Sequence, residues 1–310
     1  MPKKVVIEVE KLVKQYKDIL AVDEISFDVR QGEIFSLVGP NGAGKTTTVE
    51  ILECLRRPTD GSAKVLGLDV VEEGVKIKKR IGVMPQDFNT FERLTVRENV
   101  ELIARIYGLR GRAKEALETL DLWQIKDRKF HTLSGGMKRR VGFCMALVSD
   151  PELLFLDEPT TGLDPQARKD SWDVMRSLKE MGKTVFLTSH YMEEVERLSD
   201  RAAVIVNGKI EAVDSIRSLI LTYGGSIKVL VKGNRKKEAR DTLERLTDSV
   251  SFDEEDNLIG KFETRAEASN ALLSLYGLGE EYITETIEPG MDDVFFNLVG
   301  SKVDERGELI

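Results

Sequence analysis

A glycine-rich loop directly follows a short apolar run in the first fifth of the chain. Residues 34 to 38 read IFSLV, a buried-strand pattern, and lead into GPNGAGKTT at 39 to 47. The loop fits G-x-x-x-x-G-K-[ST] and opens a predicted helix, which is the context that the motif requires. Glycines let the backbone curl so that successive N–H groups point inward, and a helix start adds positive potential. The stretch therefore predicts a phosphate-binding loop, against the alternative of an ordinary glycine-rich turn.

Further apolar runs repeat the buried-strand pattern, and helical patterns separate them. The apolar runs are 81 to 84, 153 to 156 and 184 to 187, and the helical patterns are 97 to 107, 113 to 120, 137 to 148 and 166 to 181. This alternation predicts a largely parallel sheet covered by helices. Strands are also expected at 5 to 10 and 25 to 29. A hairpin about Asn207-Gly208 is expected from the strongest two-residue turn signal.

Polar side chains end several of these predicted strands. The segment LLFLDEP at 153 to 159 delivers Asp157 and Glu158, IGVMP precedes Gln86, and TVFLTS precedes His190. Ligands of open α/β sheets bind at the carboxyl ends of the strands, so these groups should converge there. Asp157 suits a Mg²⁺ shell and Glu158 suits a general base, against the alternative of two surface acids. The other histidine, at 131, is expected to be a bystander.

The chain changes character after residue 224. Strand and helix patterns follow in the order βαββαβ, which suggests a small ferredoxin-like module, and MDDVFFNLVG at 291 to 300 predicts a short docking helix. Residues 225 to 310 hold 11 Lys and Arg against 19 Asp and Glu, so the net charge of -8 arises in this part. An acidic region of this kind argues against nucleic acid as a partner.

The length of 310 residues suits two domains, because single cores usually stop growing near about 250–300 residues. No apolar run approaches the roughly 18 residues of a membrane-spanning helix. The start MPKKVVIEVEKL lacks the apolar core of a signal peptide, so a cytoplasmic protein is expected. Cys54 and Cys144 have no metal-ligand spacing and are expected to be buried thiols.

Taken together, these motifs resemble those of the ATP-binding-cassette (ABC) transporter ATPases, in the family's order from residue 1 to about 215. GPNGAGKTT resembles the Walker A loop, LLFLDEP the Walker B strand and LSGGM at 133 to 137 the signature motif. Gln86, TTGLDP at 160 to 165 and His190 are similar to the family's Q-loop, D-loop and H-loop. The signature motif is specific to this family among the phosphate-loop ATPases.

Within the family, the chain is most similar to single-cassette subunits of the drug-export (ABC-2) type. These share a methionine, Met137 here, where glutamine is commonest, and they end in a segment similar to MDDVFFNLVG. The resemblance implies an α/β P-loop NTPase fold with a RecA-like core, an antiparallel β subdomain and a helical subdomain at about 87–148. The ATPase domain is expected at 1–220, a small α+β, ferredoxin-like domain at 225–300 and a tail at 301–310.

The resemblance also implies ATP as the ligand and Mg²⁺ as the cofactor. Glu158 is then the catalytic base, with His190 and Lys45 on the γ-phosphate, and Tyr16 stacks on adenine. The implied metal ligands are Thr46, Gln86 and Asp157. The full set of implied nucleotide-binding residues is Tyr16, Gly39, Pro40, Asn41, Gly42, Ala43, Gly44, Lys45, Thr46, Thr47, Gln86, Ser134, Gly135, Gly136 and Asp164.

In this family the signature acts in trans, so the resemblance implies a head-to-tail homodimer with two composite ATP sites. The transport pathway is expected in a separate integral membrane permease, which would hold the chain at the inner face of the cell membrane. Docking is expected to use part of the segment 88 to 107. One alternative is a soluble mechanical ATPase of the same superfamily, and another makes the C-terminal module a regulatory or dimer-stabilising domain.

Overall fold

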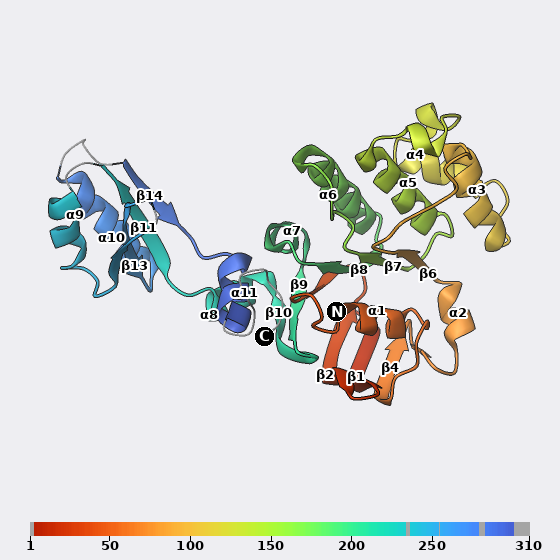
Figure 1. Ribbon diagram of the computed structural model, residues 1–310, viewed down its shortest axis with the longest axis horizontal. Helices are drawn as coiled ribbons and strands as arrows, with labels where there is room; N and C mark the ends of the chain where they lie inside the picture. Colours follow the sequence, from red (N-terminus) through yellow and green to blue (C-terminus); the bar gives the residue numbers. More distant parts are fainter. Residues whose placement is uncertain (1–2, 234–235, 254, 279–282, 301–310) are drawn as a thin grey trace. The chain divides into compact units, whose positions relative to one another are not determined.

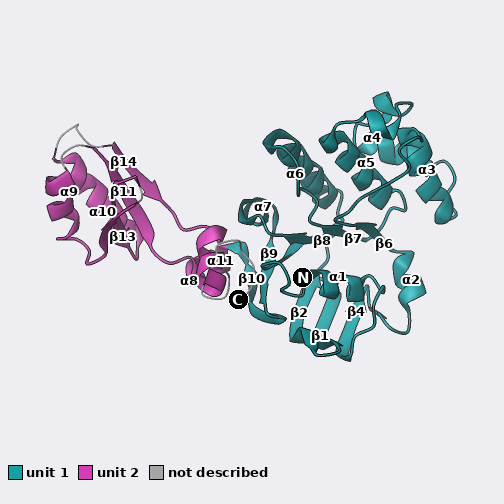
Figure 2. Cartoon of the chain, viewed as in Figure 1, with its two compact units in different colours: residues 1–216, 301–310 teal, residues 217–300 magenta. Residues whose placement is uncertain are grey.

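The computed structural model describes residues 3–233, 236–253, 255–278 and 283–300. The chain divides into two compact units, one ending at Ile216 and the other covering Arg217–Gly300 (Figure 2). The predicted tail at 301–310 lies outside the described residues. Over the described ranges, no helix combines the length and apolar character that crossing a membrane would require.

A mixed sheet forms the centre of the first unit, in the strand order β10-β9-β3-β8-β7-β6 (Figure 1). Its strands are β3 (Ile34–Val38), β6 (Ile81–Met84), β7 (Leu153–Asp157), β8 (Thr184–Ser189), β9 (Arg201–Val206) and β10 (Lys209–Ser215). Neighbouring strands are parallel except for β9 and β10, which form the hairpin predicted at Asn207-Gly208. Both turn residues have positive φ, at 49° and 77°, as this type of hairpin needs.

The central sheet is buried on both faces because successive side chains point to opposite sides of each strand. Leu154 and Leu156 of β7 belong to one core, and Phe155 between them belongs to the other. Helices cover the first face, and a second sheet together with α1 covers the other (Figure 1). The parallel strands therefore read as continuous apolar runs, which is why they were predicted correctly.

The second sheet of this unit is antiparallel, in the order β2-β1-β4-β5. Its strands are β1 (Val5–Tyr16), β2 (Ile19–Arg30), β4 (Asp60–Val65) and β5 (Leu68–Asp69), and α1 (Lys45–Leu52) and α2 (Gly74–Lys78) share this part of the fold. The ranges predicted for two of these strands, 5 to 10 and 25 to 29, are shorter than the observed β1 and β2. Lys11 and Glu24 have positive φ at irregularities in the β1–β2 register, which break the alternation and hide the strands' true length.

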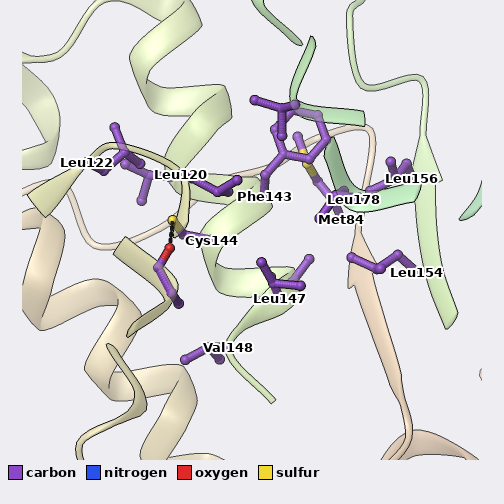
Figure 3. Packing of buried hydrophobic residues seen from close by; sticks show 14 of the residues in the cluster. Met84, Leu120, Leu122, Phe143, Cys144, Leu147, Val148, Leu154, Leu156 and Leu178 are labelled. Atoms are coloured by element: carbon purple, nitrogen blue, oxygen red, sulfur yellow. Dashed lines mark hydrogen bonds between the residues drawn. The ribbon is translucent and has the colours of Figure 1, made fainter. Parts of the chain in front are cut away.

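The helices on the other face are α3 (Val96–Ile106), α4 (Arg112–Thr119), α5 (Gly135–Leu147), α6 (Pro165–Glu180) and α7 (Met192–Leu198), with short 3-10 turns at Trp123–Ile125 and Phe130–Thr132. Figure 3 shows part of their core, in which Cys144 lies among leucines and donates to the Ala116 carbonyl at 3.2 Å. Cys144 is buried as predicted, but Cys54 is only partly buried, because it lies at the end of α1.

The second unit contains an antiparallel sheet in the order β12-β13-β11-β14. Its elements are α8 (Ile216–Tyr223), β11 (Ile227–Lys232), α9 (Lys236–Leu243), β12 (Val250–Phe252), β13 (Leu258–Phe262), α10 (Arg265–Tyr276), β14 (Ile283–Ile287) and α11 (Met291–Val299). Val229, Leu243 and Ala271 meet in its core. The order βαββαβ is the predicted one, and α11 forms where MDDVFFNLVG predicts a helix. The sequence predicts the last strand over 282 to 287, and of this range Tyr282 lies outside the described residues.

Candidate functional site

The glycine-rich loop connects β3 to α1, and Lys45 is the first residue of that helix. Its side chain is buried, and its Nζ donates to the carbonyls of Gly39 and Pro40 at 2.8 and 3.0 Å. Burial lowers the pKa of Lys45, and the nearby carboxylates Glu158 and Asp157 oppose this shift. The ammonium is therefore bonded to neutral carbonyls inside a curled loop, where an anionic phosphate would be a stronger partner.

Two glycines of the loop are required by close approach of other strands. A Cβ on Gly39 would lie 2.2 Å from the Ile205 carbonyl oxygen of β9. A Cβ on Gly44 would lie 2.4 Å from the Ala21 carbonyl oxygen of β2, and Gly44 has a φ of +104°. Both positions thus need glycine for the packing of the loop against the sheets, independently of whether a ligand is bound.

Asp157 and Glu158 leave the carboxyl end of β7, where Asp157 pairs with Thr188 of β8. The Thr188 hydroxyl donates to Asp157 Oδ1. Burial raises the pKa of Asp157, and this hydrogen bond opposes the shift. Glu158 has a φ of +44°, a conformation that is uncommon outside glycine, and its N–H donates to the Thr188 carbonyl and hydroxyl at 3.2 and 3.0 Å.

The Glu158 carboxylate is the meeting point of the predicted polar groups. Its Oε2 accepts from Gln86 Nε2 at 3.2 Å and from the Thr161 hydroxyl at 3.1 Å, and it lies 3.2 Å from His190 Nδ1. The His190 hydrogen bond, above all, holds the pKa of Glu158 below its ordinary value despite burial. Glu158, Gln86 and His190 thus converge as the sequence predicts, whereas Thr161 was missed.

The described residues contain no group of three or more His, Cys, Asp and Glu side chains that could hold a metal ion by itself. In proteins, Mg²⁺ usually binds through one or two carboxylates together with substrate phosphates and water. Asp157 is the carboxylate that the sequence predicts for this role, and its charge opposes the lowering of the pKa of Lys45. Thr46, the predicted ligand from the loop, follows Lys45 at the start of α1 and is exposed.

The signature residues form the N-terminus of α5. Ser134 is the N-cap, and its hydroxyl accepts from the Met137 N–H at 3.3 Å. Gly135 is exposed, and a Cβ there would meet nothing closer than Leu163 at 3.9 Å. A Cβ on Gly136 would lie 2.8 Å from the Ala167 Cβ of α6. The second glycine therefore allows two helices to pack, a reason that the sequence did not reveal.

The remaining predicted residues occupy the ends of nearby elements. Tyr16 ends β1, and its ring centroid lies 5.0 Å from Lys14 Nζ and 5.6 Å from Arg56 Cζ. Asp164 is the exposed N-cap of α6 and accepts from the Ala167 N–H at 2.9 Å. His131 is exposed, with its Nδ1 3.0 Å from the Glu92 carbonyl oxygen.

Comparison with known proteins agrees with this geometry. Residues 22–161 match the family model described as ABC transporter. The Nod factor export ATP-binding protein I of Burkholderia orbicola (strain AU 1054) is 37% identical over 315 residues, which cover 96% of this chain and 98% of that protein. The chain belongs to the ABC transporter ATP-binding proteins. A second relative of this family, the daunorubicin/doxorubicin resistance ATP-binding protein DrrA of Streptomyces peucetius, is 36% identical over 97% of this chain and 94% of its own length.

Solved ABC cassettes share the fold. The dimeric cassette MJ0796 in a post-hydrolysis state, bound to ADP and Pi, aligns with a TM-score of 0.60 and 30% identity over 67% of this chain and 98% of its own. The cbiO1 subunit from Clostridium perfringens aligns with a TM-score of 0.64 and 26% identity, over 79% and 96%. The chain is thus an ABC ATPase cassette with an additional C-terminal part, and it binds and hydrolyses ATP. Its relatives are transporter subunits, which favours transport over a soluble mechanical ATPase.

Proposed function

We propose that this cassette powers export through a separate membrane permease, as a homodimer with two composite ATP sites. The single observation that carries the catalytic part is the Glu158 carboxylate, on which Gln86, Thr161 and His190 converge. Export is supported by the relatives, whose names describe Nod factor export and drug resistance. Specificity for the transported compound is assigned to the permease.

In the proposed mechanism, the loop N–H groups and Lys45 bind the β- and γ-phosphates of ATP. Bound Mg²⁺, held with the phosphates by Asp157, Thr46 and Gln86, would neutralise charge on the transferred group. Glu158 accepts a proton from the attacking water while the water oxygen forms a bond to the γ-phosphorus. The bond between the γ-phosphorus and the oxygen that bridges to the β-phosphate breaks, which leaves ADP and phosphate. His190 orients the carboxylate and the γ-phosphate. A positioned base of this kind typically contributes about 10²–10⁴-fold.

The second half of each site is proposed to come from another copy of the chain. The α5 N-terminus has exposed backbone at Gly135, next to the Ser134 hydroxyl, and helix N-termini favour phosphate. Asp164 caps α6, which packs against α5 at Gly136 and Ala167, so it would lie at the same interface. The dimeric solved cassette supports this arrangement.

The permease is proposed to dock at an apolar groove between α2 and the end of α3. Val75 and Ile106 are 75% and 71% exposed. Tyr107 and Leu109 line the same groove, together with the cations Lys78 and Lys79. A cytoplasmic segment with apolar and acidic side chains would match this surface in shape and charge. The groove overlaps only the end of the predicted segment 88 to 107.

The test of the proposed function is Glu158→Gln, assayed for turnover and sized with and without ATP. The amide keeps the shape of the side chain but cannot accept the proton, so turnover should fall at least about 10²-fold. ATP should then hold the variant as a dimer. Hydrolysis at the parent rate would contradict the assignment of the base, and a variant that never associates would contradict the composite site.

A further inference from the structure

Arg139 is a buried cation of α5 that the proposed mechanism does not use. It is 8% exposed, and its guanidinium donates to the carbonyl oxygens of three residues that belong to other parts of the site. Nε donates to Pro159, Nη2 donates to Glu158 at 2.8 Å and Nη1 donates to Gln86 at 3.2 Å. One side chain therefore bonds the backbone beside the proposed base and the backbone of the Q-loop.

The chemistry of arginine suits this position. A guanidinium presents several N–H donors in a rigid planar fork, whereas a lysine ammonium is a single point on a flexible stem. Burial lowers the pKa of Arg139, and the nearby carboxylates Glu194, Asp157, Asp87 and Glu158 oppose this shift. The fork can hold three carbonyls at fixed mutual distances, which an ammonium cannot do.

The bonded carbonyls are those that fix the catalytic carboxylate. Glu158 has a φ of +44°, and its N–H is held by Thr188 while its carbonyl is held by Arg139. The Gln86 peptide held by Nη1 carries the side chain that donates to Glu158 Oε2. The two ends of this hydrogen bond are thus both anchored to Arg139.

We propose that Arg139 is a positioning residue, through which the signature helix fixes the Glu158 carboxylate and the Gln86 amide of its own chain. This inference rests on the proposed roles of Glu158 and of the signature. Arg139 lies four residues beyond the start of α5 at Gly135, about one helical turn. The helix end that would meet the partner's nucleotide is therefore rigidly connected to the base that acts on the chain's own nucleotide.

The next residue provides a matched control. Arg140 lies on the same helix, and its Nη2 also donates to a backbone carbonyl, that of Leu120 at 2.7 Å. Leu120 is the C-cap of α4, in the helical part of the fold, and is not part of the proposed site. Arg140→Lys therefore makes the same chemical change as Arg139→Lys on the same helix, because it also replaces a guanidinium that donates to a backbone carbonyl. It does so without affecting the hydrogen bonds to Glu158 or Gln86.

The first experiment compares Arg139→Lys, Arg139→Gln and Arg140→Lys in the full chain. Small displacements of catalytic groups can lower rates by about 10²-fold, so we expect kcat to fall at least about tenfold in both Arg139 variants. ATP affinity of the single chain should stay within about twofold of the parent, because Lys45 and its loop are untouched. Arg140→Lys should stay within about twofold in both quantities. Equal effects at the two positions, or a loss of ATP affinity that matches the loss of kcat, would overturn the inference.

The second experiment uses mixed dimers in which one chain carries Glu158→Gln and the other keeps Glu158. Placing Arg139→Lys in the chain with the intact base should lower turnover at least about tenfold, and placing it in the other chain should change turnover less than about twofold. A general structural defect would act from either chain, and that result would contradict a positioning role. If Glu158→Gln alone keeps the parent rate, the proposed function fails. If it is inactive and Arg139→Lys behaves as Arg140→Lys, only the inference about Arg139 fails.

Discussion

His190 Nδ1 lies 3.2 Å from Glu158 Oε2, at the point where β7 and β8 end side by side in the central sheet. This hydrogen bond is the largest cause that lowers the pKa of Glu158. A carboxylate with a lowered pKa remains ionised through the neutral range. The proposed base is therefore present in the form that can accept a proton from water.

The Thr161 hydroxyl gives a way to test this account through pH. It donates to the same oxygen of Glu158 at 3.1 Å and helps to lower the pKa of that carboxyl. Thr161→Val removes the donor, so the pKa of Glu158 should rise and the acid limb of kcat/KM against pH should move to higher pH. Thr161→Ser, which keeps a hydroxyl, should retain the parent profile. Coincident acid limbs for the valine variant and the parent would count against Glu158 as the titrating base.

Ser134→Arg tests whether the signature acts on a second chain. The long cation at the α5 N-cap should block the composite interface and reduce steady-state hydrolysis at least about 10²-fold, because the clash falls on the partner's nucleotide. ATP binding to the single chain, measured by titration at low protein concentration, should stay within about twofold of the parent. Loss of binding by the isolated monomer would instead place the signature in its own site.

The parts of the site that could be predicted are those set by local sequence. The curled loop before Lys45 and the polar residues after apolar runs follow from short motifs, because parallel strands end at one edge of the sheet. The contacts of Thr188 and Arg139 could not be predicted in this way. They depend on the pairing of β7 with β8 and on the packing of α5 against the residues after β7, which lie far apart in the chain.

The fold shows the same division. Buried parallel strands and the helix α6 were predicted within a few residues, whereas β4 and α7 were missed. The β4 sequence DGSAKV has few strand-forming residues, and it pairs because β1 offers a partner edge. Only Ala63 and Val65 of this strand are buried, so the sequence shows little alternation of apolar and polar residues. Tertiary pairing, which a single sequence does not display, decides such elements.

The α5–α6 contact predicts different effects for the two signature glycines. A Cβ on Gly136 would lie 2.8 Å from the Ala167 Cβ, whereas Gly135 has no comparably close neighbour. Gly136→Ala should therefore lower the free energy of unfolding by about 1–3 kcal/mol, as overpacking does. Gly135→Ala, the matched control, should be neutral or stabilising by up to about 1 kcal/mol through helix propensity. Urea unfolding gives these values.

A double-mutant cycle identifies the cause. Combining Gly136→Ala with Ala167→Gly removes the clash, so the two changes should show a favourable coupling of at least about 0.5 kcal/mol. Additive effects of the two substitutions would mean that contact between α5 and α6 at this point does not limit the size of residue 136.

Glu53, buried at the end of α1, predicts a dependence of stability on pH. Burial raises the pKa of Glu53 from 4.5 to about 8, and the Asp157 and Glu50 carboxylates add to this shift. Between these values the unfolded chain has lost the Glu53 proton while the folded chain keeps it. The contribution of Glu53 to the free energy of unfolding is therefore fully present below about pH 4.5. It is lost progressively as the pH rises to about 8.

Glu53→Gln removes the titrating group while keeping its shape. The variant should match the parent near pH 4.5 and become more stable than the parent as the pH rises to about 8, where the gain levels off. Each unit of pKa corresponds to about 1.4 kcal/mol, so the gain should reach a few kcal/mol. Urea unfolding across this range measures it, and Glu72→Gln at an exposed position is the control. A gain that is the same at both ends of the range would show that Glu53 is not protonated in the folded chain.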